Sequence, residues 1–154
     1  PAAGVGCSFG LSGDFTLAAK SAYFLQAFVN IGLVPDGGSS WLLPRLVGLP
    51  RATQMMMLGE KIGGEQAADW GLVYKCVEDA ELMSEARALA GRLANGPTVS
   101  LGTMRKILRD GLSQSFAQTL DAEAMGQFVA GNSEDAVEGV LAFVEKRKPN
   151  WLGK

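Results

Sequence analysis

The spacing of hydrophobic residues along the chain changes about halfway. Over residues 1–78, short apolar runs alternate with turns rich in Gly and Pro, a pattern typical of short buried strands and helices. From residue 79 onward, apolar residues recur at helical spacing. The first such stretch contains Leu82, Ala86, Leu89 and Leu93 and stops at Asn95-Gly96-Pro97. We therefore expect an α/β segment over 1–78 and an all-helical region over 79–154.

The same pattern predicts the individual elements. In the first region we expect helices over 7–13, 38–46, 50–58 and 65–70, and strands over 15–19, 23–25 and 72–77. In the second region we expect helices over 79–95, 98–111, 115–130 and 134–146. Gly and Pro predict a loop over 31–38 and a turn over 59–64. Pro44 is expected to kink or interrupt its helix, which should end near Gly48.

Composition narrows the class of protein. With 154 residues and 47% hydrophobic content, the chain can bury a core without disulfides or metal. A net charge of −2 predicts neither a nucleic-acid partner nor attraction to an anionic membrane, and no apolar run is long enough to span a bilayer. The two distant cysteines and the lack of a signal-peptide pattern indicate a soluble, reduced, cytoplasmic protein. A start at Pro1, without methionine and within a loop, suggests a fragment.

The chain contains no histidine. This excludes Ser-His-Asp and Cys-His catalysis within the chain, as well as most transition-metal sites. Any proton transfer by these residues would fall to carboxylates. We expect no metal and no separate cofactor.

Gly4-Val5-Gly6 precedes a predicted helix. Backbone N–H groups at a helix N-terminus can bind an anion or a developing oxyanion. The spacing does not match a dinucleotide-binding fingerprint, because the third glycine falls at Gly10 and no strand precedes the motif. Spacing alone favours a tight structural turn over a catalytic loop.

Asp36 lies between Pro35 and two glycines, just before a predicted helix. The commoner role for such a residue is an N-cap that satisfies free amide groups. Apolar residues surround Asp36 in the sequence, so its carboxylate could instead face a water-poor pocket and act as a base. Burial would raise its pKa and the helix dipole would lower it. These neighbours include Phe24, Phe28, Ile31, Leu33, Val34 and Trp41.

Several motifs in this order resemble the crotonase (enoyl-CoA hydratase/isomerase) superfamily. They are P-A-A-G-V-G-C, L-A-A-K-S-A-Y-F, I-G-L-V-P-D-G-G-S-S-W-L-L-P-R-L-V-G, L-G-E-K-I, A-A-D-W-G-L-V and A-F-V-E-K-R-K-P. Within the superfamily the chain most resembles 1,2-epoxyphenylacetyl-CoA isomerases, followed by Δ3,Δ2-enoyl-CoA isomerases. The resemblance implies the C-terminal part of a spiral of ββα turns, followed by helices that pack subunits into trimers or hexamers.

The resemblance also assigns roles to residues. The backbone N–H of Val5, in the turn that begins at Gly4, matches the second oxyanion donor, and the first would belong to a preceding segment. Hydratase glutamates fall on Ser8 and Phe28, neither of which can activate water. The carboxylate of the isomerases matches Asp36, so one base would transfer the proton.

Further positions would contact the substrate. Phe24, Phe28 and Trp41 suggest an aromatic or otherwise apolar acyl pocket, and Gly4 and Val34 are also expected to contact the substrate. Phe143 and Lys146 match positions that meet the coenzyme A of a neighbouring subunit, although charge near a helix end is more often simply solvated. Coenzyme A would be part of the substrate rather than a cofactor.

The function implied is isomerisation of an acyl-CoA thioester, either an enoyl-CoA or 1,2-epoxyphenylacetyl-CoA, through a thioester enolate. Three alternatives remain open at this stage. The first is an enoyl-CoA hydratase, and the second is a dehalogenase-type hydrolase in which Asp36 acts as a nucleophile. The third is a binding or assembly fragment without turnover.

Overall fold

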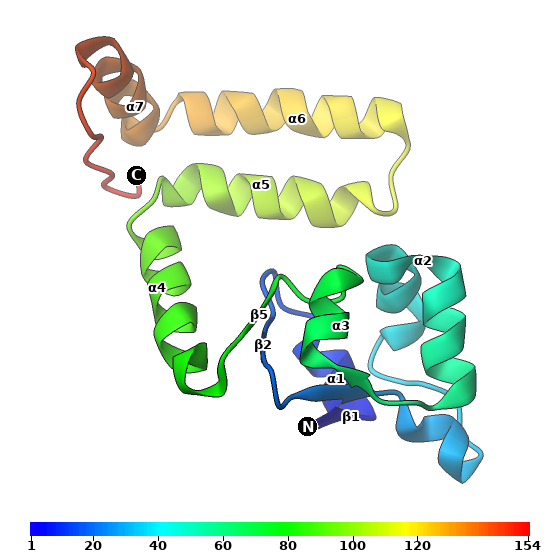
Figure 1. The fold of residues 1–154 in the computed structure, drawn as a ribbon. Helices are drawn as coiled ribbons and strands as arrows, with labels where there is room; N and C mark the ends of the chain where they lie inside the picture. Colours follow the sequence, from blue (N-terminus) through cyan, green and yellow to red (C-terminus); the bar gives the residue numbers. More distant parts are fainter. The chain divides into compact units, whose positions relative to one another are not determined.

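The computed structural model describes all residues from 1 to 154, and the chain divides into two compact units, Pro1–Ala86 and Arg87–Lys154 (Figure 1). Helix α4 (Leu82–Ala94) runs across the boundary between them.

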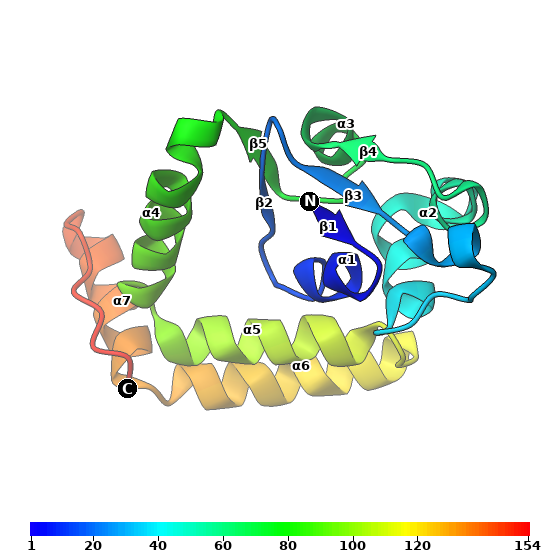
Figure 2. The same ribbon diagram turned by 90° about the horizontal axis from the view of Figure 1, so that it is seen from below.

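The first unit contains two small sheets. In one, β3 (Tyr23–Leu25) lies between β1 (Ala2–Ala3) and β4 (Ile62–Gly63), parallel to β1 and antiparallel to β4. In the other, β2 (Leu17–Ala19) pairs in parallel with β5 (Lys75–Val77), as Figure 2 shows. Each strand has only two or three residues, so the sheets depend on the helices that pack against them.

Four helical segments accompany these strands, and a fifth leads into α4. They are α1 (Val5–Gly10), the 3₁₀ helix η1 (Ala27–Ile31), α2 (Ser39–Leu58), α3 (Gly64–Asp69) and the 3₁₀ turn η2 (Asp79–Glu81). The helices predicted over 38–46 and 50–58 are the two halves of α2.

The break in α2 lies at Gly48 and not at Pro44, so the expectation of a kink at proline was wrong. Gly48 has φ of 78° and ψ of 161°, and it is the one residue inside α2 with non-helical dihedral angles. Pro44 lies near the start of α2, where it removes a single helical hydrogen bond. Glycine reaches a positive φ without steric cost, so the helix bends at Gly48.

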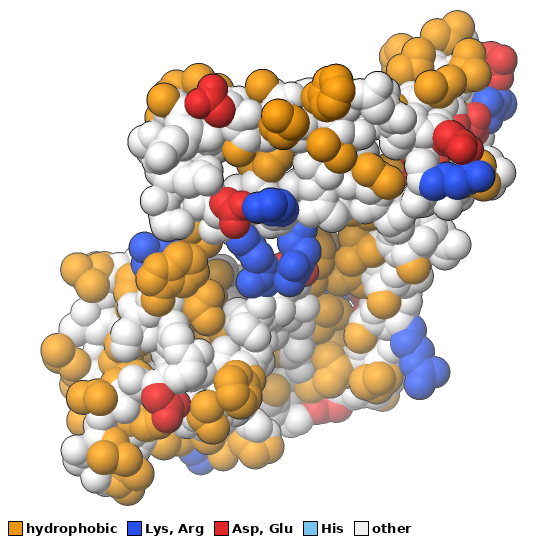
Figure 3. Space-filling model, turned by 180° about the vertical axis from the view of Figure 1, so that it is seen from behind, with side chains coloured by type: hydrophobic (Ala, Val, Ile, Leu, Met, Phe, Trp, Pro, Cys, Tyr) orange, Lys and Arg blue, Asp and Glu red, His pale blue; other side chains and the backbone are white.

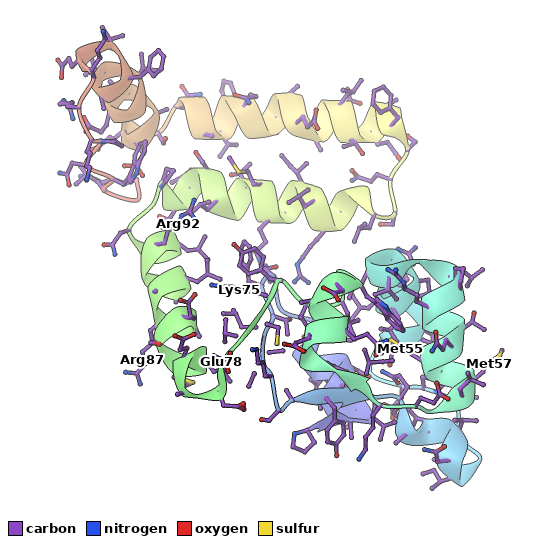
Figure 4. The ribbon with its side chains drawn as sticks, in the orientation of Figure 1. Met55, Met57, Lys75, Glu78, Arg87 and Arg92 are labelled. Carbon is purple, nitrogen blue, oxygen red and sulfur yellow. The ribbon has the colours of Figure 1, made fainter.

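A hydrophobic core joins these elements. Met55 in the second half of α2 is fully buried, whereas Met57, two residues later on the opposite side of the helix, is 70% exposed (Figure 4). The other buried core residues are Cys7, Leu11, Ala18, Phe24, Leu43, Val47, Ala52, Ile62, Ala67, Leu72 and Val73. They come from both sheets and from α1, α2 and α3, so the core fixes the positions of the loops between them.

The second unit is entirely helical. Helices α5 (Thr98–Gly111) and α6 (Phe116–Gly131) lie side by side in opposite directions, and α7 (Glu134–Glu145) follows (Figures 1 and 2). Ser115 forms a capping box with Gln118 at the start of α6, and the Ser133 side chain accepts the Ala136 N–H at the start of α7. The prediction of a helix over 98–111 is confirmed to the residue.

Two carboxylates attach the C-terminal residues to α7. Buried Asp135 accepts the Leu152 and Gly153 N–H groups at 2.6 and 3.0 Å. Glu138 receives two hydrogen bonds from the Arg147 guanidinium and one from the Asn150 N–H. These contacts lower the pKa of Glu138 from 4.5 to about 2, mainly through the Arg147 hydrogen bonds.

Hydrophobic side chains remain on the surface, the hairpin of α5 and α6 included (Figure 3). On α6 these are Phe116, Leu120, Met125, Phe128 and Val129. None of the helices has the length and apolar character needed to cross a bilayer. No group of three or more Cys, Asp or Glu side chains is arranged to bind a metal ion.

Candidate active site

The turn at Gly4 leaves an amide group free at the start of α1. Gly4 has φ of 54° and ψ of −130°, its N–H donates to the Leu25 carbonyl at 2.9 Å, and its carbonyl accepts the Cys7 and Ser8 N–H groups. The Val5 N–H has no acceptor within the chain. The glycine turn therefore ends in an unpaired donor, as an oxyanion-binding role requires.

Asp36 does not cap α2. The N-cap is Gly38, in the left-handed conformation with φ of 86°, and no side chain caps this helix end. The Asp36 carboxylate is exposed and makes no hydrogen bond or ion pair within the chain. The more common interpretation of the local sequence was thus wrong, and the carboxylate is free for other chemistry.

The backbone of Asp36, in contrast, is firmly held. Its carbonyl oxygen lies 2.9 Å from the Ser8 hydroxyl oxygen and 2.7 Å from the Ser39 hydroxyl oxygen, within hydrogen-bond distance of both. The two hydroxyl oxygens are 2.6 Å apart, and both serines are almost completely buried. Sequence reasoning considered Ser8 only as the absence of a glutamate and did not consider Ser39 at all.

Gly37 brings the Asp36 loop against α1. A Cβ atom at Gly37 would lie 2.9 Å from Ser8 Cβ and 3.2 Å from Val5 Cγ2, and the residue has φ of 61°. Only glycine fits this approach without displacement. The loop that carries the exposed carboxylate is therefore packed on the side chains of the helix whose first amide is free.

The other expected pocket residues lie around this region but are not enclosed in this unit. Phe28 in η1 approaches Gly4, since a Cβ at Gly4 would be 3.8 Å from Phe28 Cζ. Val34 is 81% exposed, and the exposed Trp41 ring stacks under the Arg45 guanidinium at 4.0 Å. The water-poor environment expected for Asp36 is not present among the residues of this unit.

Two buried groups lie near the site without an evident role in proton transfer. Burial raises the pKa of the Cys7 thiol, which keeps it protonated and unreactive. Gln26 is fully buried, and its amide nitrogen and oxygen have no hydrogen-bond partner, although the Cys7 thiol lies close to it.

Phe143 and Lys146 belong to the second unit. Phe143 is 85% exposed and helps line an open pocket of about 310 Å³ together with Gly139, Val140 and Trp151. Lys146 ends α7 with φ of 53° and is the one non-glycine residue of the chain with a positive φ. A left-handed residue is a common way for a helix to end, so this conformation is explained by the C-terminus of α7.

Comparison with known proteins identifies the family. The family model described as "Enoyl-CoA hydratase/isomerase" matches residues 1–154. The chain therefore belongs to the enoyl-CoA hydratase/isomerase family, the crotonase family.

Two curated relatives are similar to almost the whole chain. One, from Rhodobacter capsulatus, is named as a probable enoyl-CoA hydratase and is 44% identical over 153 residues, which are 99% of this chain and 60% of the relative. The other is 1,2-epoxyphenylacetyl-CoA isomerase of Escherichia coli K12, 42% identical over 99% of this chain and 58% of the relative. The chain thus spans about three fifths of the length of these relatives.

Solved structures share the fold. An enoyl-CoA hydratase of Polaromonas sp. JS666 matches with a TM-score of 0.92 at 33% identity over 97% of this chain and 58% of that one. An enoyl-CoA hydratase/isomerase of Cupriavidus metallidurans CH34 matches with a TM-score of 0.94 at 32% identity over 99% of this chain and 58% of that one.

Proposed function

We propose that these residues form part of an acyl-CoA isomerase in which Asp36 is the acid/base residue and the Val5 N–H is one oxyanion donor. The observation that carries the proposal is the free Asp36 carboxylate, on a loop packed against the Val5 side chain. Ser8 and Phe28, which occupy the hydratase glutamate positions by resemblance, carry no carboxylate.

This arrangement suits an allylic isomerisation. Asp36 would remove a proton next to the thioester carbonyl and return it at a different carbon, so that one base suffices. The negative charge that develops on the thioester oxygen would be stabilised by the oxyanion donors, each contributing about 3–4 kcal/mol in other enzymes. By resemblance, the family's first donor would belong to a segment that precedes these residues, and the Val5 N–H would be the second.

The substrate proposed is a coenzyme A thioester with an apolar or aromatic acyl group, either an enoyl-CoA or 1,2-epoxyphenylacetyl-CoA. Gly4, Phe28, Val34 and Trp41 would border the acyl group. Phe143 and Lys146 would contact coenzyme A, and an ammonium group is suited to a phosphate as a point charge. No additional cofactor is needed for this chemistry.

Replacement of Asp36 by Asn tests the proposal. The change keeps the size of the side chain and removes its basicity, so we expect the full-length protein to lose isomerase activity by roughly 10²-fold or more. Binding of the acyl-CoA and the thermal unfolding midpoint should remain unchanged. The measurements are double-bond isomerisation of a 3-enoyl-CoA and solvent deuterium incorporation at the α-carbon. Full activity in the variant would remove Asp36 from the mechanism.

A hydratase is the second candidate, because the relative of 44% identity is named as a probable enoyl-CoA hydratase. Water addition requires a group that positions and activates water, and neither Ser8 nor Phe28 can ionise to do so. Hydration of crotonyl-CoA by the wild-type protein at an ordinary enzymatic rate would favour this candidate. A covalent acyl-aspartyl species on Asp36 would favour the dehalogenase-type hydrolase, and acyl-CoA binding without any turnover would favour a binding or assembly role.

We also propose that the protein is cytoplasmic and assembles as a homotrimer or hexamer through its C-terminal helices. The exposed apolar side chains of α6, among them Phe116, Leu120 and Phe128, support the assembly, because large exposed apolar patches mark surfaces that contact other proteins.

A further inference from the structure

We propose that Ser8 and Ser39 are positioning residues that fix the loop of residues 32–38, which carries Asp36, on α1. They would so hold the base in place relative to the turn at Gly4-Val5, whose Val5 N–H is the proposed oxyanion donor. The inference rests on the proposed function in taking Asp36 as the base. Neither serine would contact the substrate, and both would act through the peptide backbone of Asp36.

The first observation is that the side chain of Asp36 has no partner in the chain, whereas its backbone carbonyl is hydrogen-bonded. Its carboxylate is exposed and bonded to nothing in the chain, so no side-chain contact determines where the carboxylate lies. Its carbonyl is partly buried and lies within 2.9 Å of two hydroxyl groups. The backbone attachment is therefore what restricts the position of the base.

The second observation is the number of protons available. The Ser8 hydroxyl, the Ser39 hydroxyl and the Asp36 carbonyl form a triangle with sides of 2.9, 2.7 and 2.6 Å. Two hydroxyl protons can serve only two of these three contacts at a time. In either favourable arrangement, one serine donates to the carbonyl and the other donates to the first serine.

This geometry makes the two serines interchangeable as donors. If Ser39 loses its hydroxyl, the Ser8 proton can turn to the Asp36 carbonyl, and the reverse holds if Ser8 loses its hydroxyl. If both are lost, the carbonyl retains only the Ser39 N–H at 3.3 Å, a long hydrogen bond. The carbonyl would then be held poorly only in the double variant.

The third observation links the serines to the oxyanion turn. Ser8 lies in the short helix α1 that begins at Val5, and the loop at Gly37 contacts the side chains of both Ser8 and Val5. A shift of the Asp36 backbone away from Ser8 would therefore also be a shift away from Val5. Misplacement of a reacting group by about 1 Å can cost on the order of 10²-fold in rate.

The test is a double-mutant cycle in the full-length protein, with Ser8→Ala, Ser39→Ala and the double variant. We expect each single change to reduce kcat by only about two- to threefold and the double change by roughly 10- to 100-fold, more than the product of the single effects. KM should stay within about twofold in all three. Ser40→Ala, at the neighbouring and exposed position of α2, is the matched control and should leave kcat unchanged.

Two further measurements separate positioning from simple loss of stability. Solvent deuterium exchange at the substrate α-carbon should fall in parallel with kcat in the double variant, because both report on the base. Ser8→Ala/Ser39→Thr restores one hydroxyl and should recover most of kcat, even if its thermal midpoint stays low.

An unchanged kcat in a folded double variant, or a fall in kcat that merely follows the unfolded fraction, would overturn the inference. The proposed function is judged by a different variant, since it fails if Asp36→Asn retains activity. Loss of activity in Asp36→Asn together with a fully active double serine variant would reject the positioning role alone.

Discussion

At the scale of single residues, Asp36 combines an exposed carboxylate with an anchored backbone. The following two glycines make this possible, because Gly37 and Gly38 both have positive φ values and turn the chain sharply into α2. At this helix end the Ser39 N–H donates to the Asp36 carbonyl and the Trp41 N–H to the Gly38 carbonyl, so the Asp36 side chain makes no capping hydrogen bond. Asp36 therefore does not act as the helix N-cap that its position in the sequence would favour.

Gly37→Ala, compared with Gly38→Ala, should show whether kcat depends on the close contact of the Asp36 loop with Ser8 and Val5 or only on backbone strain. The added Cβ would lie 2.9 Å from Ser8 Cβ, so the loop must move away from α1, and we expect kcat to fall roughly 10- to 100-fold. Steady-state isomerisation kinetics and the thermal midpoint are the measurements.

Gly38→Ala is the matched control for that experiment. Gly38 has φ of 86°, so alanine there brings a similar strain of about 1–2 kcal/mol, but no atom lies within 4 Å of its added Cβ. Similar losses of kcat in the two variants would show that strain, and not contact with Ser8 and Val5, accounts for the effect.

At the scale of elements, the first unit depends on close approaches between short pieces of secondary structure. Gly64 opens α3, is buried, and donates its N–H to the Ala22 carbonyl at 2.9 Å. A Cβ at this position would be 2.4 Å from the Ala19 carbonyl oxygen at the end of β2. Because this neighbour is backbone, it cannot turn aside as a flexible side chain would.

We therefore expect Gly64→Ala to lower the free energy of unfolding by about 1–3 kcal/mol. Urea denaturation followed by circular dichroism would measure the change. Gly63→Ala is the neighbouring control, because Gly63 has φ of −68° and no atom within 4 Å of an added Cβ. That variant should stay within about 0.5 kcal/mol of the wild type. An equally stable Gly64→Ala protein would contradict the close approach of α3 to β2.

The elements also show what could be predicted from sequence. The helices over 98–111, 115–130 and 134–146 were predicted closely because Ser115, Ser133 and the apolar periodicity are local signals. Strands β1 and β4 were missed, because each has two residues and exists only through pairing with β3. The break near Gly48 was expected from the sequence, but the kink at Pro44 was wrong, because a proline near the start of a helix removes only one helical hydrogen bond.

At the scale of the whole molecule, much apolar surface on the helical unit is uncovered. Phe128 on α6 is 69% exposed, whereas the neighbouring Gln127 is a polar exposed residue. If this surface joins copies of the chain, Phe128→Glu should weaken the assembly, since a charge would be buried in an apolar contact. Light scattering coupled to gel filtration would show a shift towards smaller species.

Gln127→Glu adds the same charge one residue earlier on the same helix. We expect it to leave the molar mass unchanged, which distinguishes loss of the apolar contact from a general effect of charge. A wild-type protein that is monomeric at all concentrations would contradict the proposed trimer or hexamer.

The sequence by itself determined the helices over 98–111, 115–130 and 134–146 closely, and it determined the lack of histidine. These features are local or compositional, so they can be read without coordinates. The tertiary structure alone decided that Asp36 is not a helix cap and that Ser8, 28 residues away, holds its carbonyl. Such contacts depend on how the core brings α1 and the Asp36 loop together, and neither the spacing nor the character of nearby residues encodes that approach.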